Sequence, residues 1–384
     1  MTRASRSVLF AILSAVAFVT VQAKTPLSAE KMWSLKRLGD PAISPDGKLA
    51  VVPVTHYDVK ENKGFTDLWS VPTAGGPARQ LTSDAAADTS PTFSPDGRWI
   101  AFVSKRGTDE QNQIYVIAVD GGEARRVTNI PTGAGIPKWF PDSQRIAFVS
   151  EIWGDLTRWE DQVRRVKERA DSKMSAKVWN RAPIAYWDHH LDDREPHVFS
   201  IALEGGEPTA ITRMSGFFLS KNEYDAFSYD VSPDGEEIAI ATNTDKTGVD
   251  PNFDIVLLAS CGCKPARNLS TDNPSGDDEP RYSPDGRHLV WLRQEIKGFY
   301  ADRQRLMLHE RAPGKTRELT ENWDRSADNL VWLPDGKGLL GAIDDAATQR
   351  IYRFDLKGTT PKRVTTTPSF HYMEIGRASC RERV

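Results

Sequence analysis

The sequence predicts an all-β protein, a β-propeller built from four-stranded blades. Three observations support this class of fold: a Ser-Pro-Asp-Gly turn recurs along the chain, its copies are nearly evenly spaced, and an apolar strand follows the turn. The clearest copy is residues 93–97, which precede the apolar run 99–103. A repeat of about 40–50 residues that holds four antiparallel strands is typical of one propeller blade.

The turn occurs six times, and its spacing locates the blades. The aspartates of the six copies are Asp46, Asp96, Asp142, Asp234, Asp285 and Asp335. Successive copies are 50, 46, 92, 51 and 50 residues apart, so one gap is double the others. Proline presets φ for the second position of a type I turn, and glycine suits the left-handed position that follows. Ser143 replaces glycine in the third copy, and we expect that turn to be more strained.

A second hairpin follows the turn in each unit, as in residues 113–119 followed by 124–128. Each unit therefore supplies four strands. The runs 100–103 and 146–149 are apolar on both faces, which favours sheets packed between two neighbours over a one-sided sandwich. We expect six recognisable blades, the first beginning near Pro41, and a truncated seventh that opens at residues 368–372.

The double gap predicts a helical insertion at residues 151–195, which we place between blades three and four. Its apolar residues recur at steps of three and four, namely Leu156, Trp159, Val163, Val166, Ala170 and Met174. This spacing indicates an amphipathic helix, with Asp155 as N-cap and Glu160 paired with Arg164 four residues later. We expect the helix to pack on one face of the propeller or against another domain.

Two segments contain side chains that can bind metals. Residues 186–194 contain two histidines and three aspartates, but adjacent histidines rarely converge on one ion. We therefore expect a polar rim that leads into a strand at 197–201. Cys261 and Cys263 flank Gly262 at a hairpin turn, where a disulfide is possible and two thiolates alone make a poor zinc site. No metal or cofactor site is predicted.

The two ends of the sequence differ from the repeats. Residues 1–23 combine Arg3 and Arg6 with the apolar run 8–19 and small residues before Ala23, which predicts a cleaved export signal. An uncleaved anchor is the alternative, but the run is short for a membrane span. The propeller domain is then 24–373 in a periplasmic or secreted protein without membrane attachment. Residues 374–384 resemble no strand and are interpreted as a non-native tail.

Composition and motifs exclude several functions. The chain of 384 residues has 50 basic and 53 acidic residues and a formal net charge of −3, which gives no field that favours nucleic acid. Three cysteines are too few for a disulfide scaffold. The sequence has no Gly-x-Ser-x-Gly, no Gly-rich phosphate loop and no His-Glu-x-x-His. The residues alone therefore indicate a binding or gating scaffold without a catalytic residue.

The opening segment 27–41, the Ser-Pro-Asp-Gly repeats and the segment 186–194 together resemble a known family. They are similar to the N-terminal half of bacterial prolyl oligopeptidase family (S9) serine peptidases, in particular the acylaminoacyl-peptidase and dipeptidyl-peptidase 5-like group. The similarity covers about 27–372, although TolB-like propellers share the turn. It implies a seven-bladed propeller followed by an α/β-hydrolase domain with Ser, Asp and His. In that family the propeller admits short peptides and excludes folded proteins, and its loops help to bind the peptide N-terminus.

The predicted function follows from where this similarity stops. No nucleophile motif follows residue 372, so no catalytic residue is assigned and the chain alone is expected to be inactive. Glu160 and Asp161 are weak candidates for contacting a peptide amine, with solvated helix residues as the alternative. We interpret the chain as the substrate-gating propeller of an exported S9 peptidase, truncated before its hydrolase domain. A stand-alone TolB-like propeller that binds protein partners is the other hypothesis, and no feature indicates an oligomeric state.

Overall fold

The computed structural model describes residues 26–367, apart from 177, 180–184, 222–223, 246 and 248–250. The predicted signal (1–23), the opening of a seventh blade (368–372) and the predicted tail (374–384) lie outside the described residues. The chain divides into two units, Met1–Leu35 and Lys36–Val384. In the first unit, helix α1 (Ala29–Trp33) begins after Ser28, whose hydroxyl accepts a hydrogen bond from the Lys31 N–H.

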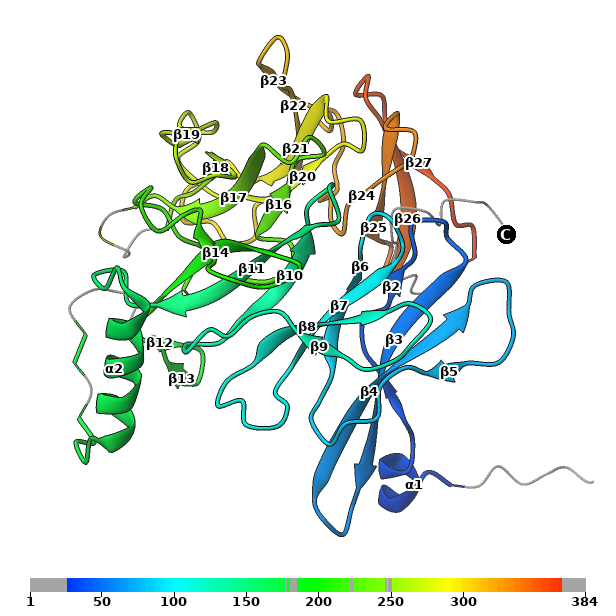
Figure 1. Cartoon of the computed structure of the whole chain (residues 1–384). Helices are drawn as coiled ribbons and strands as arrows, with labels where there is room; N and C mark the ends of the chain where they lie inside the picture. The colour runs from blue at the N-terminus through cyan, green and yellow to red at the C-terminus, as the bar shows by residue number, and fades with distance from the viewer. Residues whose placement is uncertain are drawn as a thin grey trace, which may run out of the picture. The chain divides into compact units, whose positions relative to one another are not determined.

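Among the described residues, the second unit contains six antiparallel blades (Figure 1). The sheet of blade one has five strands and the others have four, and an insertion separates the second and third strands of blade three. Blade one contains β1 (Arg37–Leu38), β2 (Ala42–Ile43), β3 (Leu49–Asp58), β4 (Lys63–Pro72) and β5 (Arg79–Gln80). Blade two contains β6 (Thr89–Phe93), β7 (Trp99–Ser104), β8 (Gln113–Ala118) and β9 (Arg125–Arg126). Blade three contains β10 (Gly135–Trp139), β11 (Arg145–Ile152), β14 (Glu195–Ala202) and β15 (Thr209–Ala210).

The remaining blades repeat this order. Blade four contains β16 (Tyr229–Val231), β17 (Glu237–Asn243), β18 (Phe253–Ala259) and β19 (Arg267–Asn268). Blade five contains β20 (Asp277–Tyr282), β21 (His288–Arg293), β22 (Arg305–Glu310) and β23 (Lys315–Glu318). Blade six contains β24 (Val331–Trp332), β25 (Gly338–Asp345), β26 (Thr348–Asp355) and β27 (Lys362–Arg363). The predicted all-β propeller of four-stranded units is confirmed.

The recurring turn joins the first two strands of a blade and uses its serine structurally. The Ser94 hydroxyl donates to Asp96 Oδ1 at 2.6 Å and accepts from the Trp99 N–H at 2.9 Å. Gly97 takes the left-handed conformation at φ 71°, and its N–H donates to the Ser94 carbonyl. The same pattern recurs at Ser44, Ser232 and Ser283. A hydroxyl that is fully used in this way defines the turn and is not poised as a nucleophile.

The apolar core lies between neighbouring blades, as strands that are apolar on both faces predict. Along β7, Ile100 and Phe102 belong to a cluster shared with blade one, whereas Ala101 and Val103 belong to a cluster shared with blade three. Three further clusters join blades three and four, four and five, and five and six. Each blade therefore depends on its neighbour to bury a face, which is the usual logic of repeat architectures.

The position of the helical insertion requires a correction. Strands β11 and β14 pair along their whole length, from Arg145 opposite Ala202 to Ile152 opposite Glu195. Both belong to blade three, so the insertion connects the second and third strands of that blade and does not lie between blades three and four. It contains helix α2 (Trp159–Asp171) and a small hairpin of β12 (Ala185–Tyr186) and β13 (His189–His190). The expected polar rim at 186–194 thus begins with this hairpin.

Candidate functional site in the blade three insertion

Helix α2 is fixed to the propeller through one buried amide. Gln162 is only 1% exposed. Its Oε1 accepts from the Trp153 N–H at 3.1 Å, and its Nε2 donates to the carbonyls of Trp153 and Leu156 at 2.9 and 3.0 Å. Because a buried amide and backbone groups are costly to leave unpaired, these bonds hold the start of the insertion against the end of β11.

The start of α2 differs from the prediction. Arg158 occupies the N-cap position without a side-chain capping bond, and Asp155 instead forms a two-pronged ion pair with Arg165 at 3.0 and 3.1 Å. Arg164 pairs with Asp161 at 2.7 Å rather than with Glu160. The predicted N-cap and the predicted Glu160–Arg164 pair are therefore wrong. Asp155 binds the guanidinium of Arg165 and so does not cap the helix. The guanidinium of Arg164 binds Asp161 and so does not pair with Glu160. Both are charge-assisted bonds, which are stronger than neutral ones.

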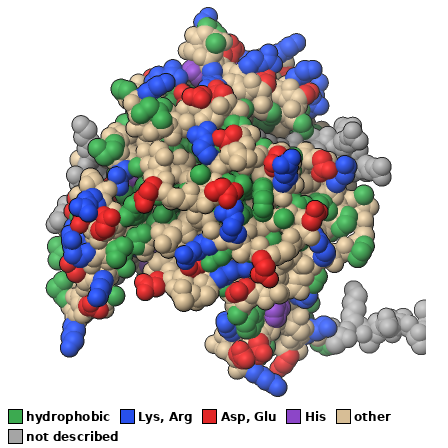
Figure 2. Space-filling view, viewed as in Figure 1, with side chains coloured by type: hydrophobic (Ala, Val, Ile, Leu, Met, Phe, Trp, Pro, Cys, Tyr) green, Lys and Arg blue, Asp and Glu red, His purple; other side chains and the backbone are tan. Residues whose placement is uncertain are grey.

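The apolar side of α2 is only partly covered. Trp159 packs on Phe199 of β14, with 5.5 Å between ring centroids. Val163 is 51% exposed, and Met174, beyond the end of the helix, is 72% exposed. The stripe therefore packs on the propeller at Trp159, whereas the predicted alternative, packing against another domain, stays a prediction for the two exposed residues. Figure 2 shows acidic and basic side chains interspersed over the visible face, as the small net charge predicts.

Trp153 is the centre of the site. Its ring is buried and lies near three guanidinium groups, those of Arg165, Arg169 and Arg194, at 5.5, 4.7 and 5.8 Å from the centroid. Its Nε1 donates to Asp193 Oδ1 at 3.0 Å. Cation–π attraction together with this hydrogen bond brings the helix and the segment after β13 onto one indole.

Carboxylates balance these arginines. Arg194 contacts Glu151 at 3.1 Å and Asp192 at 3.0 Å, and Arg169 pairs with both Asp192 and Asp193. Although burial opposes ionisation of Asp192, its hydrogen bonds with Arg194 and Asp193 hold its pKa well below the ordinary value. Although burial opposes the charged form of Arg194, the same pairing with Asp192 raises its pKa. Both groups are charged at neutral pH.

A pocket of about 420 Å³ opens beside this network. It is lined by Glu151, His189, His190, Leu191, Asp192, Arg194, Pro196, Lys221 and Tyr224. The Tyr224 hydroxyl donates to Glu151 Oε1 at 2.9 Å, and Lys221 Nζ donates to the Asp193 carbonyl at 3.3 Å. Burial and the neighbouring Glu151 raise the pKa of Tyr224 well above its ordinary value, so it remains a hydrogen-bond donor.

The arrangement offers charges of both signs to a ligand. The described residues that line the pocket include two carboxylates, two cations, two imidazoles and a phenol. Among the described residues, no group of three or more His, Cys, Asp or Glu side chains could hold a metal ion. Charges of both signs at one concave surface can orient a small zwitterion, such as the end of a peptide.

The predicted site residues lie outside this pocket. Glu160 and Asp161 are in the first turn of α2, and neither lines the pocket. A hydrogen bond from its own backbone N–H, followed by one from Arg158, lowers the pKa of Glu160, which is exposed. Both carboxylates already have arginine partners, Arg158 and Arg164.

Sequence reasoning missed Glu151, Lys221 and Tyr224. Glu151 is the penultimate residue of β11, and the other two lie about 70 residues later in the connection between β15 and β16. No repeat or motif marks them, because they meet only through the closure of blade three against blade four. The polar segment 186–194 was the one signal available, and it does contribute His189, His190, Asp192 and Arg194 to the pocket.

Fold and site together define a β-propeller domain with a charged, peptide-sized pocket at a helical insertion. A family model, the tricorn protease N-terminal beta propeller domain, matches residues 63–182. Dipeptidyl-peptidase 5 of Porphyromonas gingivalis is 30% identical over 354 residues, which are 88% of this chain and 49% of that protein. The chain is homologous to the N-terminal propeller half of dipeptidyl-peptidase 5, a peptidase of family S9.

Two solved structures share the fold. An acylaminoacyl peptidase in complex with Z-Gly-Gly-Phe-chloromethyl ketone has a TM-score of 0.63 at 16% identity, over 88% of this chain and 47% of that chain. The β-propeller domain of the trilobed protease from Pyrococcus furiosus, which has an open velcro topology, has a TM-score of 0.53 at 13% identity over 86% of both chains. The present chain spans about half the length of the curated relatives it matches.

Proposed function

We propose that this chain is the substrate-gating propeller of an exported S9-type serine peptidase that cleaves short peptides. The observation that carries the proposal is the 30% identity with dipeptidyl-peptidase 5, which extends over 88% of the chain. The catalytic serine, aspartate and histidine then belong to an α/β-hydrolase half outside this sequence. The contribution of the propeller is to select and orient the peptide.

The pocket at the insertion supplies a physical basis for selection. Glu151 accepts bonds from Tyr224 and Arg194, and a carboxylate has acceptor sites for a third donor. A peptide ammonium placed there gains a charge-assisted hydrogen bond. Lys221 lies on the same pocket and can pair with a carboxylate of the peptide. The pocket, rather than Glu160 and Asp161, is therefore the proposed amine-binding site.

The test is peptide binding to the purified chain. Titration calorimetry with tetra-alanine and with N-acetylated tetra-alanine distinguishes recognition of the free amine from recognition of the backbone. We expect the free peptide to bind more tightly, and Glu151→Gln to weaken its binding about tenfold, which is roughly 1.4 kcal/mol. Binding of the acetylated peptide should change little.

Glu160→Gln is the matched control, because Glu160 is an exposed carboxylate that does not line the pocket. Its affinity for tetra-alanine should equal that of the unmodified chain. Equal losses in both variants, or no binding of either peptide, would contradict the proposal. Capture of a folded protein partner without any peptide binding would instead favour a stand-alone binding propeller.

Because the proposal places the catalytic residues outside this sequence, the chain alone should have no peptidase activity. Purified material should not release p-nitroaniline from dipeptidyl or acylaminoacyl p-nitroanilides. Turnover that survives repeated purification and a serine-directed inhibitor control would show that the chain has a catalytic site of its own. Export is tested separately by cell fractionation, in which the protein should lack residues 1–23.

A further inference from the structure

We propose that the Cys261–Cys263 disulfide is a thiol-exchange site, at which a small carboxylate-bearing thiol forms a mixed disulfide with Cys263. The two cysteines are bonded to each other across a single residue. They form the turn between β18 and β19, and both side chains are exposed. This site lies outside the insertion and does not depend on the proposed peptidase function.

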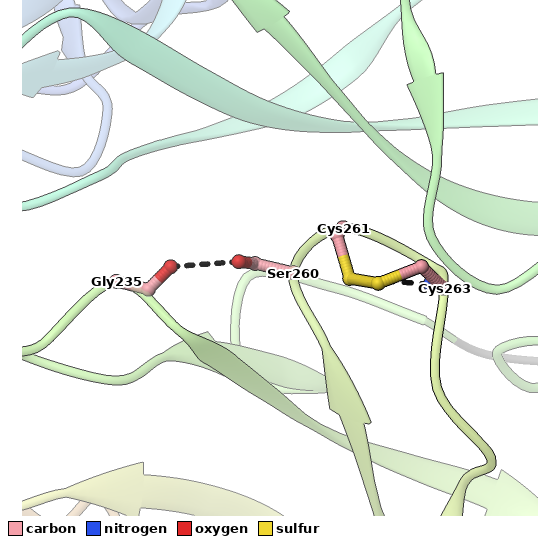
Figure 3. The surroundings of a disulfide bond; sticks show 4 residues. All are labelled: Gly235, Ser260, Cys261 and Cys263. Atoms are coloured by element: carbon pink, nitrogen blue, oxygen red, sulfur yellow. Dashed lines mark hydrogen bonds between the residues drawn. A yellow bond between two sulfur atoms is a disulfide. The ribbon is translucent and has the colours of Figure 1, made fainter.

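The turn is bonded to its own blade, blade four, and packs closely on blade three. Ser260, which is buried, donates its hydroxyl to the Gly235 carbonyl at 2.7 Å, as Figure 3 shows. Gly262 has φ 61°, and a Cβ at this position would lie 2.2 Å from the Ala210 carbonyl oxygen. The backbone therefore fits closely on β15 while the two sulfur atoms remain accessible. Exposed disulfides are the ones that exchange with thiols most readily.

The two sulfur atoms are not equivalent. Cys263 lines a pocket of about 390 Å³ and Cys261 does not, so a thiol seated in the pocket lies beside Cys263. The Cys263 N–H donates to Cys261 Sγ at 3.3 Å (Figure 3). A hydrogen bond to a developing thiolate stabilises it and makes it the better leaving group. Attack on Cys263, with Cys261 leaving, is the favoured direction.

The pocket identifies the class of thiol. Its apolar side is formed by Met214 and Phe217, and its polar side includes Ser215 and Lys264. Lys264 is exposed, and none of the described residues that line the pocket is acidic. A thiol that carries a carboxylate, such as glutathione or a cysteinyl peptide, therefore meets a complementary charge.

The exchange balances without any other reactant. The thiolate of the small molecule attacks Cys263 Sγ, a new S–S bond forms, and the Cys261–Cys263 bond breaks with its electron pair on Cys261 Sγ. That thiolate takes one proton from solvent. A second small-molecule thiolate can then attack the small-molecule sulfur of the mixed disulfide, which releases a symmetrical disulfide and leaves Cys263 as a thiolate that takes a proton. The protein is then reduced to two thiols, and two small thiols are oxidised to one disulfide.

The test uses the full chain with Cys380→Ser, so that only this pair of cysteines remains. The protein is exposed briefly to reduced glutathione, quenched with N-ethylmaleimide and analysed by peptide mass spectrometry. We expect glutathione on Cys263 and maleimide on Cys261, with a preference of about tenfold over the reverse pattern.

Lys264→Glu tests the ligand class, because it alters an exposed residue that forms no part of the disulfide. It should slow reaction with glutathione about three- to tenfold at low ionic strength, with the difference shrinking in high salt. Cysteamine, a cationic thiol, should not be slowed. Three results would overturn the proposal. The first is modification mainly of Cys261, and the second is two free thiols in protein taken from an oxidising compartment. The third is no glutathione adduct under conditions in which dithiothreitol reduces the disulfide. Unchanged glutathione rates in Lys264→Glu would overturn its ligand class.

Discussion

The backbone N–H of Asp96 donates a hydrogen bond to Ser143 Oγ at 3.1 Å, which ties the turn of blade two to the turn of blade three. Ser143 is the residue that replaces glycine in the repeat, and it has φ 55°. Its hydroxyl thus provides an acceptor that a glycine could not. The left-handed backbone costs roughly 1 to 2 kcal/mol for a residue with a Cβ, and the hydrogen bond offsets part of that cost.

Substitutions at Ser143 separate these two effects. Ser143→Ala keeps the left-handed strain and leaves the Asp96 N–H without its acceptor, so it should destabilise the chain by about 1 to 2 kcal/mol. Ser143→Gly loses the same acceptor but relieves the strain, so its loss should be smaller. Urea unfolding measures both. Ser90→Ala is the control, because Ser90 is an exposed serine at φ 53°, and no effect is expected. Greater loss in Ser143→Gly than in Ser143→Ala would refute this account.

The blades could be predicted because their signals are local. Proline and glycine at fixed turn positions specify the backbone of each turn within five residues, and the apolar run that follows specifies a strand buried on both faces. Pairing between neighbours in sequence then follows with few alternatives. Even the exception at Ser143 was visible as a missing glycine, although its bond to Asp96, 47 residues earlier, was not.

Only the segment 186–194 of the site had a signal in the sequence, because the other contacts of the site join distant segments. The helix was predicted from its period, but its N-cap depends on whether Asp155 meets a backbone N–H or the side chain of Arg165. The pocket depends on Glu151 meeting Tyr224, 73 residues later in the chain. Neither choice has a signature in residue spacing, because competing partners for a carboxylate differ by small free energies.

The half-buried carboxyl of Glu279 predicts a pH dependence of stability. Burial raises its pKa to about 7, the nearby Asp278, Asp328 and Asp225 add to the shift, and Arg281 opposes it. The pKa is thus higher in the folded chain than its ordinary value of 4.5. The protonated carboxyl therefore stabilises the folded chain. This contribution is complete below the ordinary pKa of 4.5 and is lost as the pH rises through about 7.

Glu279→Gln removes this titration. At pH 8 the variant should be more stable than the unmodified chain by roughly 1 to 3 kcal/mol, and the difference should vanish near pH 4. Urea unfolding at the two pH values measures it. Asp285→Asn should change stability in the opposite direction. Although burial raises the pKa of Asp285, hydrogen bonds from Ser283 and Arg287 lower it to about 2. That variant should lose stability at pH 8 and less at pH 3. A pH-independent gain in Glu279→Gln would contradict the assignment.

The anchoring role of Gln162 predicts a local effect. Gln162→Leu keeps the approximate volume but leaves the Trp153 N–H and the Leu156 carbonyl without the Gln162 amide, whereas the Trp153 carbonyl keeps its bond from the Leu156 N–H. The cost should be about 1 to 3 kcal/mol for such buried groups. Hydrogen exchange should accelerate in α2 while the amides of β17 remain protected. Val163→Ala, an exposed substitution one residue away, should leave exchange unchanged. Faster exchange throughout the propeller would show that the insertion is not a separate cooperative unit.

The close approach at Gly262 predicts the largest loss of stability. Gly262→Ala places a Cβ 2.2 Å from the Ala210 carbonyl oxygen and imposes the left-handed penalty as well. We expect a loss of about 2 to 5 kcal/mol. Gly298→Ala is the matched control: Gly298 has φ 71°, but no atom lies within 4 Å of its added Cβ. That variant should lose only about 1 to 2 kcal/mol, the cost of the backbone alone. Urea unfolding gives the free energy of unfolding of both variants, and the difference between their losses is the cost of the contact with Ala210. Equal losses would mean that β15 moves to make room for the added Cβ.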